Sequence, residues 1–173
     1  ALRIFPEPGP IAFAWEEAEL TIALPPGAPV GRMGERVVTL TSIAEDRRGN
    51  RLEKTYEFAY TTGDSIPSGA IEGKLSGGTR TPARILLFAA PGPPIDSLAA
   101  VDPIRETAPE PSGDFRFSHL TVGVEYSYAL FALSKESSGP GLDPDRDRVA
   151  FGPDSLRLTA DSAIVSGIAL KLT

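Results

Sequence analysis

Apolar residues in this chain alternate with polar ones in short runs, which is the pattern of β-strands with one buried face. Three such runs lie in the first third of the sequence, at residues 19–24, 36–43 and 52–60. The last run places Tyr56, Phe58 and Tyr60 on one face of its strand. The polar loop before it contains Gly49 and Asn50, which tolerate the positive φ of tight turns, so the second and third runs are predicted to form a hairpin.

The alternation stops at residues 61–69, a stretch of glycine, proline and small polar residues that cannot continue a strand. A new alternating run begins at Ala70. The sequence therefore predicts two β modules in tandem, residues 1–67 and residues 68–173.

The second module contains further strand-like runs, at residues 70–75, 83–90, 114–117, 126–133, 155–159 and 164–172. Residues 83–90 are apolar without interruption, which indicates a strand covered on both faces. Residues 96–101 are predicted as a short helical turn, and residues 102–113 as a polar excursion broken by prolines. No segment repeats its apolar residues at the helical period of 3.6, so the predicted fold class is all-β.

Composition fits a globular β protein and excludes some partners. The 173 residues include 17 glycines, 17 prolines and 41% hydrophobic residues, enough to fill a core between frequent turns. The formal net charge of −6 argues against nucleic acid as a partner, because phosphate binding needs clustered lysine and arginine. Cysteine is absent, so packing must hold the fold without disulfides.

No apolar run reaches the roughly 18 residues of a membrane-spanning helix. Residues 2–5 do not have the layout of a signal peptide. If the natural protein is exported, we expect its targeting segment to lie outside this sequence.

The first half resembles the bacterial Ig-like domains of S-layer and surface proteins. The resemblance rests on Trp15, the runs around Leu20 and Val37, the Asp46–Asn50 turn, and the Phe58–Asp64 stretch. The strands expected before Trp15 are largely missing, so the resemblance implies a partial Ig-like module.

The second half resembles a carboxypeptidase-regulatory-like or CnaB-type β-sandwich, which has a transthyretin-like fold. The matching segments are residues 69–75, 84–88 and 113–117, followed by Tyr126. The fold implied for the whole chain is thus a pair of tandem β-sandwich modules, the first one partial. Some members of this family cross-link a lysine to an asparagine, but residues 68–173 contain no asparagine, so we expect no such bond.

The most chemical-looking segment is an acidic loop in which Asp143, Asp145 and Asp147 alternate with other residues. Calcium binds six to eight oxygen ligands, and alternating carboxylates can supply several of them. Arg146 and Arg148 can instead neutralise the same carboxylates. Calcium is therefore a candidate cofactor at these three aspartates, and a solvated, salt-bridged loop without a cofactor is the favoured alternative.

His119 is the sole histidine of the sequence, and Ser118 precedes it. Neighbours on a strand point to opposite faces, so the two cannot form a catalytic pair by adjacency. No Gly-x-Ser-x-Gly elbow occurs, and one histidine without cysteine cannot build an ordinary zinc site. We therefore expect no catalytic residues and a protein that is not an enzyme.

Aromatic residues offer a further possibility, because a coplanar exposed set can stack on sugars. The candidates are Trp15, Tyr56, Phe58, Tyr60, Tyr126 and Tyr128. Their alternation with polar residues favours core packing for most of them.

The resemblances imply a structural, adhesive or spacer module of a bacterial exported protein at the cell surface or in the periplasm. Its expected partners are other domains of the same polypeptide, or proteins and glycans of the cell envelope. The alternative is a carbohydrate-binding accessory module of a secreted enzyme. A third possibility is that residues 1–67 pair with another chain along a strand edge, which would give a homodimer.

Overall fold

The computed structural model describes residues 2–17, 19–31, 34–46, 48–77, 83–123, 126–139, 141–153 and 155–173. It confirms an all-β protein, whose described residues contain one short 3₁₀ turn, η1 (Ile95–Ser97), and no other helix. The first five strands are β1 (Leu2–Phe5), β2 (Ala12–Glu16), β3 (Glu19–Ala23), β4 (Glu35–Leu40) and β5 (Tyr56–Thr61). The remaining strands are β6 (Gly69–Ser76), β7 (Arg84–Ala89), β8 (Arg105–Thr107), β9 (Asp114–Leu120), β10 (Ser127–Ser134), β11 (Arg148–Phe151), β12 (Leu156–Arg157) and β13 (Ile164–Lys171).

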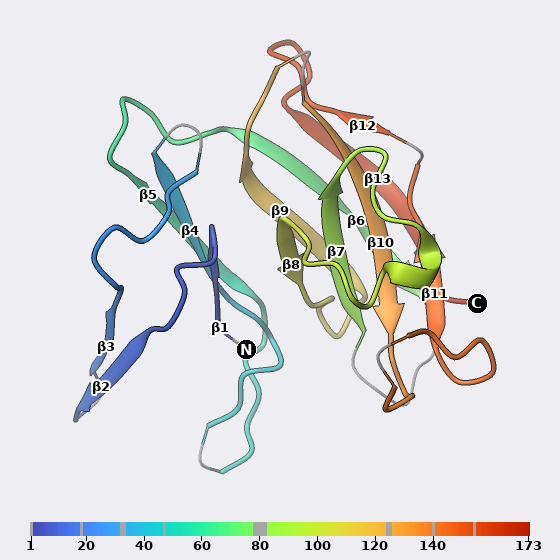
Figure 1. Cartoon of the computed structure of the whole chain (residues 1–173), viewed down its shortest axis with the longest axis horizontal. Helices are drawn as coiled ribbons and strands as arrows, with labels where there is room; N and C mark the ends of the chain where they lie inside the picture. The colour runs from blue at the N-terminus through green and yellow to red at the C-terminus, as the bar shows by residue number, and fades with distance from the viewer. Residues whose placement is uncertain are drawn as a thin grey trace.

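Strands β6 to β13 form two sheets that share one apolar core. One sheet has the order β11-β10-β7-β8, with β12 also paired to β10, and the other has the order β13-β6-β9. In the second sheet β13 runs parallel to β6 and β9 runs antiparallel to it. The core takes buried residues from both sheets, including Ile71, Ile85, Phe117, Leu130 and Leu170, together with Leu158 just after β12. Figure 1 shows these strands grouped on the right of the molecule.

Strand β7 is covered on both faces, as its uninterrupted apolar sequence predicts. Ile85 and Leu87 belong to the core between the sheets. Leu86 and Phe88 point the other way into a second cluster, which Leu98 closes from the segment after η1. The predicted helical turn near residue 96 is thus the cover of the outer face of β7.

Strands β1 to β5 lie on the left of Figure 1, apart from the two facing sheets. Strands β1, β4 and β5 form an antiparallel sheet in that order, and β2 and β3 form a separate hairpin. The strands on either side of the predicted break belong to different sheets, and β5 and β6 extend into it as far as Thr61 and Gly69. One face of the β1-β4-β5 sheet meets β8 and β9, through contacts described below.

The other face of that sheet overturns the prediction that its aromatic residues pack in a core. Tyr56, Phe58 and Tyr60 are 52%, 59% and 40% exposed. They alternate regularly, as a buried face would, but no second sheet covers them in the part of the chain that the structure describes. The same holds for Leu20, 36% exposed on the β2-β3 hairpin, where a half-buried strand was predicted.

No helix in the described part of the chain has the length and apolar character needed to cross a membrane.

Candidate functional site

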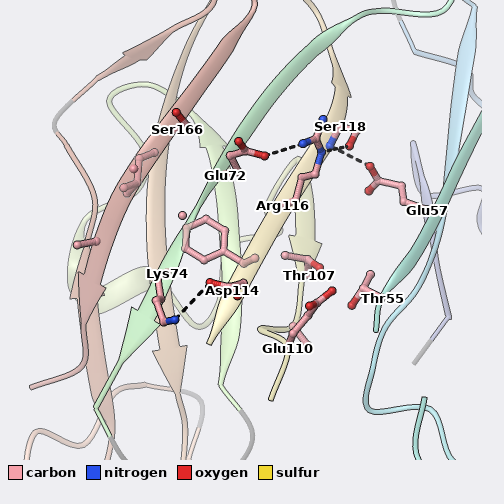
Figure 2. Close-up of a pocket in the computed structure, with 16 residues that line it drawn as sticks. Thr55, Glu57, Glu72, Lys74, Thr107, Glu110, Asp114, Arg116, Ser118 and Ser166 are labelled. Carbon is pink, nitrogen blue, oxygen red and sulfur yellow. Dashed lines mark hydrogen bonds and ion pairs between the residues drawn. The ribbon is translucent and has the colours of Figure 1, made fainter. Parts of the chain in front are cut away.

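A groove lies where the β1-β4-β5 sheet meets the β13-β6-β9 sheet. We call it the junction groove, and it has a volume of about 540 Å³. Its floor is the outer face of β13-β6-β9, and its side walls are the start of β5 and the segment that follows β8. Figure 2 shows its polar residues, which come from β5, β6, β8, β9 and β13 and from two loop positions, Thr55 and Glu110.

Paired charges cover the floor of the junction groove. Glu72 and Arg116 lie directly opposite each other on β6 and β9 and form an ion pair at 2.6 Å. Two residues further along the same strands, Lys74 faces Asp114 at 3.6 Å. These cross-strand pairs are partly exposed, so each adds no more than about 1 kcal/mol to stability while fixing where the charges lie.

A buried ion pair joins the β1-β4-β5 sheet to the two facing sheets. Arg105 on β8 is 4% exposed, and its guanidinium donates to the Glu57 carboxylate on β5. The Arg105 guanidinium also donates to the Ser118 carbonyl (3.1 Å) and stacks over the Phe5 ring at 5.6 Å. Glu57 accepts the Ser118 backbone N–H at 2.9 Å and the Thr39 hydroxyl at 3.1 Å. Four strands, β4, β5, β8 and β9, therefore meet in one hydrogen-bonded network, and β1 joins it through the stacking of Arg105 on Phe5.

Both ions of this pair are well satisfied. Burial lowers the pKa of Arg105, and the neighbouring Glu57 carboxylate opposes that shift. An arginine stays protonated even so, because its guanidinium is effectively always charged in proteins. The pair is thus a permanent ionic contact between parts of the chain that are 48 residues apart.

A bulge in β9 shapes this contact. Gly69 faces Leu120 and Ile71 faces Phe117, so Ser118 and His119 together lie opposite one residue of β6. His119 has φ +58°, the left-handed conformation that bulges often require. The sequence analysis assumed that the side chains of Ser118 and His119 point to opposite faces of a regular strand, and this alternation does not hold at a bulge. The Ser118 hydroxyl accepts the Nε–H of Arg116 at 3.0 Å.

The acidic loop holds its three aspartates in different environments. Asp147 is buried and accepts hydrogen bonds from the backbone N–H groups of Glu136, Ser137 and Asp143, at 2.7, 2.8 and 2.9 Å. The Ser137 hydroxyl donates at 2.6 Å, and the Lys135 ammonium lies at 3.4 Å. The carboxylate therefore ties together both ends of the loop.

Burial alone would raise the pKa of Asp147, but the hydrogen bonds from Ser137, Asp143 and Glu136 lower it well below its usual value. Asp143 accepts the backbone N–H of Asp145 at 3.0 Å, and Asp145 is exposed. The residues that the structure describes contain no group of three or more His, Cys, Asp or Glu side chains placed to share a metal ion. Calcium binding at Asp143, Asp145 and Asp147 stays a prediction. The hydrogen bonds of Asp147 to backbone N–H groups hold the loop in its folded conformation.

The remaining aromatic candidates separate by exposure. Tyr128 lies in the core, donates its hydroxyl to the Thr121 carbonyl at 2.9 Å, and has a pKa that burial raises to about 12. Tyr126 packs against the same core. The side chain of Trp15 lies outside the described residues. Among the candidates whose side chains the structure describes, Tyr56, Phe58 and Tyr60 form the exposed aromatic row.

Sequence reasoning missed the residues that build the junction. Arg105 and Thr107 lie in the stretch predicted as a polar excursion, and Glu57 was seen only as a polar position between aromatics. The Arg105–Thr107 alternation of buried and half-buried residues is too short to stand out as a strand. Arg105 pairs with a carboxylate 48 residues earlier in the chain. This contact arises from the tertiary structure and cannot be predicted from the local sequence.

Comparison of the chain with protein-family models, with curated proteins and with solved structures gave no match in any of the three.

Proposed function

We propose that this protein is a non-enzymatic structural and adhesive module of a bacterial exported protein, acting at the cell surface or in the periplasm. The observation that carries the proposal is the buried Arg105–Glu57 pair, which fastens the β1-β4-β5 sheet to the two facing sheets. The resemblance of the two halves to Ig-like and CnaB-type modules supports the same role. The partners would be neighbouring domains or molecules of the cell envelope.

A module of this kind needs a body that keeps its shape under load. Removing one member of a buried ion pair strands the other charge, at a cost of about 3–5 kcal/mol. Sliding the two parts against each other would break the same contacts, so the pair resists motion at the junction. The net charge of −6 would keep such a body soluble among anionic polymers.

A double-mutant cycle with Glu57→Gln and Arg105→Met tests this role. Each single change is expected to lower the free energy of unfolding by about 3–5 kcal/mol, and the double variant should lose less than the sum. The matched control is Arg3→Gln, which breaks the exposed Arg3–Glu106 pair and should cost no more than about 1 kcal/mol.

Rigidity has its own readout in ¹⁵N relaxation. The amides of β4 and β5 should share one rotational correlation time with those of β7 and β10, and Glu57→Gln should separate the two values. Two correlation times in the unmodified protein, or strictly additive cycle energies, would rule out a rigid spacer.

A carbohydrate-binding module is the second candidate, favoured by the exposed row of Tyr56, Phe58 and Tyr60. Residues two apart on a strand lie about 6.7 Å apart along one face, so the rings form a continuous strip. Affinity electrophoresis in gels that contain neutral or acidic polysaccharides tests it. Retention that Phe58→Ala abolishes would support this function, and migration equal to that in plain gels would remove it.

A further inference from the structure

Strand β5 leaves one edge of its sheet open. It is the last strand in the order β1-β4-β5, and no strand in the described part of the chain pairs with its other side. The Thr62 backbone N–H donates to the Gly34 carbonyl at 3.0 Å, and antiparallel bonding alternates from this pair along the β4–β5 register. The backbone groups of Phe58 therefore point toward β4, whereas those of Glu57 and Ala59 point away from it. Neither of these two residues has a backbone partner on that open side among the described residues.

This edge lacks the features that protect the other edges. Among the edge strands of the three larger sheets, β1, β8, β11 and β12 have four residues or fewer, and β9 and β13 contain a bulge. Strand β5 has six residues in continuous register, without lysine or proline. Its one charged residue, Glu57, is bound to Arg105 on the inner face of the sheet. A regular edge of this kind can pair with the edge of another chain.

The order of side chains along β5 indicates that the other chain is a second copy. Tyr56 and Tyr60 lie at equal spacing on either side of Phe58, so the aromatic row reads the same from both ends. When two β5 strands pair antiparallel about Phe58, that residue faces its counterpart and each Tyr56 faces Tyr60 of the second copy. No shifted register pairs all three rings.

The backbone fits the same register. Pairing about Phe58 places Glu57 opposite Ala59 of the second copy, and these are the residues whose N–H and C=O groups point to the open side. They form the hydrogen-bonded pairs, and the aromatic rings fall at the pairs without hydrogen bonds, where side chains approach most closely. The direction of the backbone groups and the symmetry of the row therefore agree independently.

Charges at the two ends of β5 are also complementary. The Lys54 ammonium lies over the Tyr56 ring at 5.5 Å, at the start of the strand. Asp64 is exposed and follows the end of the strand. In an antiparallel pair the start of each strand lies beside the end of the other, so each Lys54 is brought toward Asp64 of the second copy.

We propose that two copies of this chain associate by antiparallel pairing of their β5 strands, centred on Phe58. The two β1-β4-β5 sheets then form one continuous sheet, with the aromatic rows joined in a single strip. This inference goes beyond the proposed function, because a spacer or adhesive module does not require a dimer. Either idea can fail without the other.

Sedimentation equilibrium of the full chain tests the pairing. The unmodified protein should show a reversible monomer–dimer equilibrium with a Kd of about 1–100 μM, since an interface of this size is weak. Phe58→Lys and Phe58→Glu each place two like charges opposite each other, so each should weaken association at least about ten-fold. Phe58 is 59% exposed, so both variants should fold. An equimolar mixture of the two should restore association, because the introduced lysine faces the introduced glutamate.

Phe13→Lys is the matched control, because Phe13 is 52% exposed on β2, away from β5. It should leave the Kd unchanged. Ala59→Pro removes an N–H on the open side, spares the bonds to β4, and should weaken association at least about ten-fold.

A protein that remains monomeric at about 0.5 mM would overturn the proposal. So would Phe58 or Ala59 variants that associate like the unmodified protein, or an equal loss in Phe13→Lys. A mixture of the two Phe58 variants that associates no better than either alone would rule out pairing centred on Phe58.

Discussion

Single residues in this protein organise segments much longer than themselves. Asp147 gathers the backbone N–H groups of Glu136, Ser137 and Asp143 on one buried carboxylate, and thereby closes the acidic loop. The sequence does not predict this role, because Asp143, Asp145 and Asp147 alternate in the same way and nothing local distinguishes Asp147 from the other two. What separates them is burial and the supply of donors, and both depend on how the loop folds back.

Asp147→Asn is expected to lower the free energy of unfolding by about 2–4 kcal/mol at pH 7, because a neutral amide leaves several buried donors poorly satisfied. The folded-state pKa of Asp147 is depressed, so its contribution is fully present above the unfolded pKa of about 3.9 and is lost as pH falls below that value. The difference in free energy of unfolding between the unmodified protein and the Asp147→Asn variant should therefore be smaller at pH 3 than at pH 7.

Urea denaturation at pH 7 and pH 3 measures the effect. Asp145→Asn is the control, and should change stability by no more than about 0.5 kcal/mol because Asp145 is exposed. Equal losses in the two variants, or a gap that does not depend on pH, would contradict this role of Asp147.

At the scale of elements, sequence periodicity identified most of the long strands and the break between the two sets. It located β3 to β7, β9, β10 and β13 because each is long enough to show alternation or a continuous apolar run. It missed β1, β2, β8 and β11, which are short or flanked by proline and glycine. The candidate site depends on β8, so most of its residues could not be predicted from the local sequence pattern.

Close approach between strands makes one glycine of β6 irreplaceable. A Cβ at Gly73 would lie 2.3 Å from the Ile168 carbonyl oxygen and 2.8 Å from the Phe115 ring. Gly73→Ala must push β13 away from β6, and we expect a loss of at least about 2 kcal/mol in chemical denaturation.

Gly139→Ala is the matched change, since nothing lies within 4 Å of its Cβ position and its φ is not in the left-handed region. That variant should differ from the unmodified protein by no more than about 0.5 kcal/mol. If both alanine variants are equally stable, the packing of β13 on β6 is looser than described.

For the whole molecule, apolar surface is distributed unevenly. The two facing sheets enclose most of their large apolar residues, although Phe151 and Ile164 are exposed, while the β1-β4-β5 sheet leaves an aromatic row in solvent. Regular alternation is the same in both, because the pattern records which face is apolar and not what covers it. That is the physical reason why the core prediction failed for Tyr56, Phe58 and Tyr60.

Two phenylalanines should therefore respond differently to truncation. Phe117→Ala removes a fully buried ring from the shared core and should cost about 3–5 kcal/mol. Phe58→Ser removes an exposed ring, should cost less than about 1 kcal/mol, and should weaken binding of a hydrophobic dye to the folded protein. Thermal denaturation measures the stability of both variants, and dye fluorescence measures the exposed apolar surface of Phe58→Ser. A large loss of stability in Phe58→Ser would mean that the row of Tyr56, Phe58 and Tyr60 is covered in solution.

The buried Arg105–Glu57 contact bears on how this chain can be dissected in the laboratory. The stretch at residues 61–69 looks like an ideal place to cut, being short of apolar residues and lying between two sets of strands. A fragment that starts there would keep Arg105 without its counter-ion and would uncover the sides of β8 and β9. Recombinant work on either half should therefore retain the other, or replace Arg105 with an apolar residue.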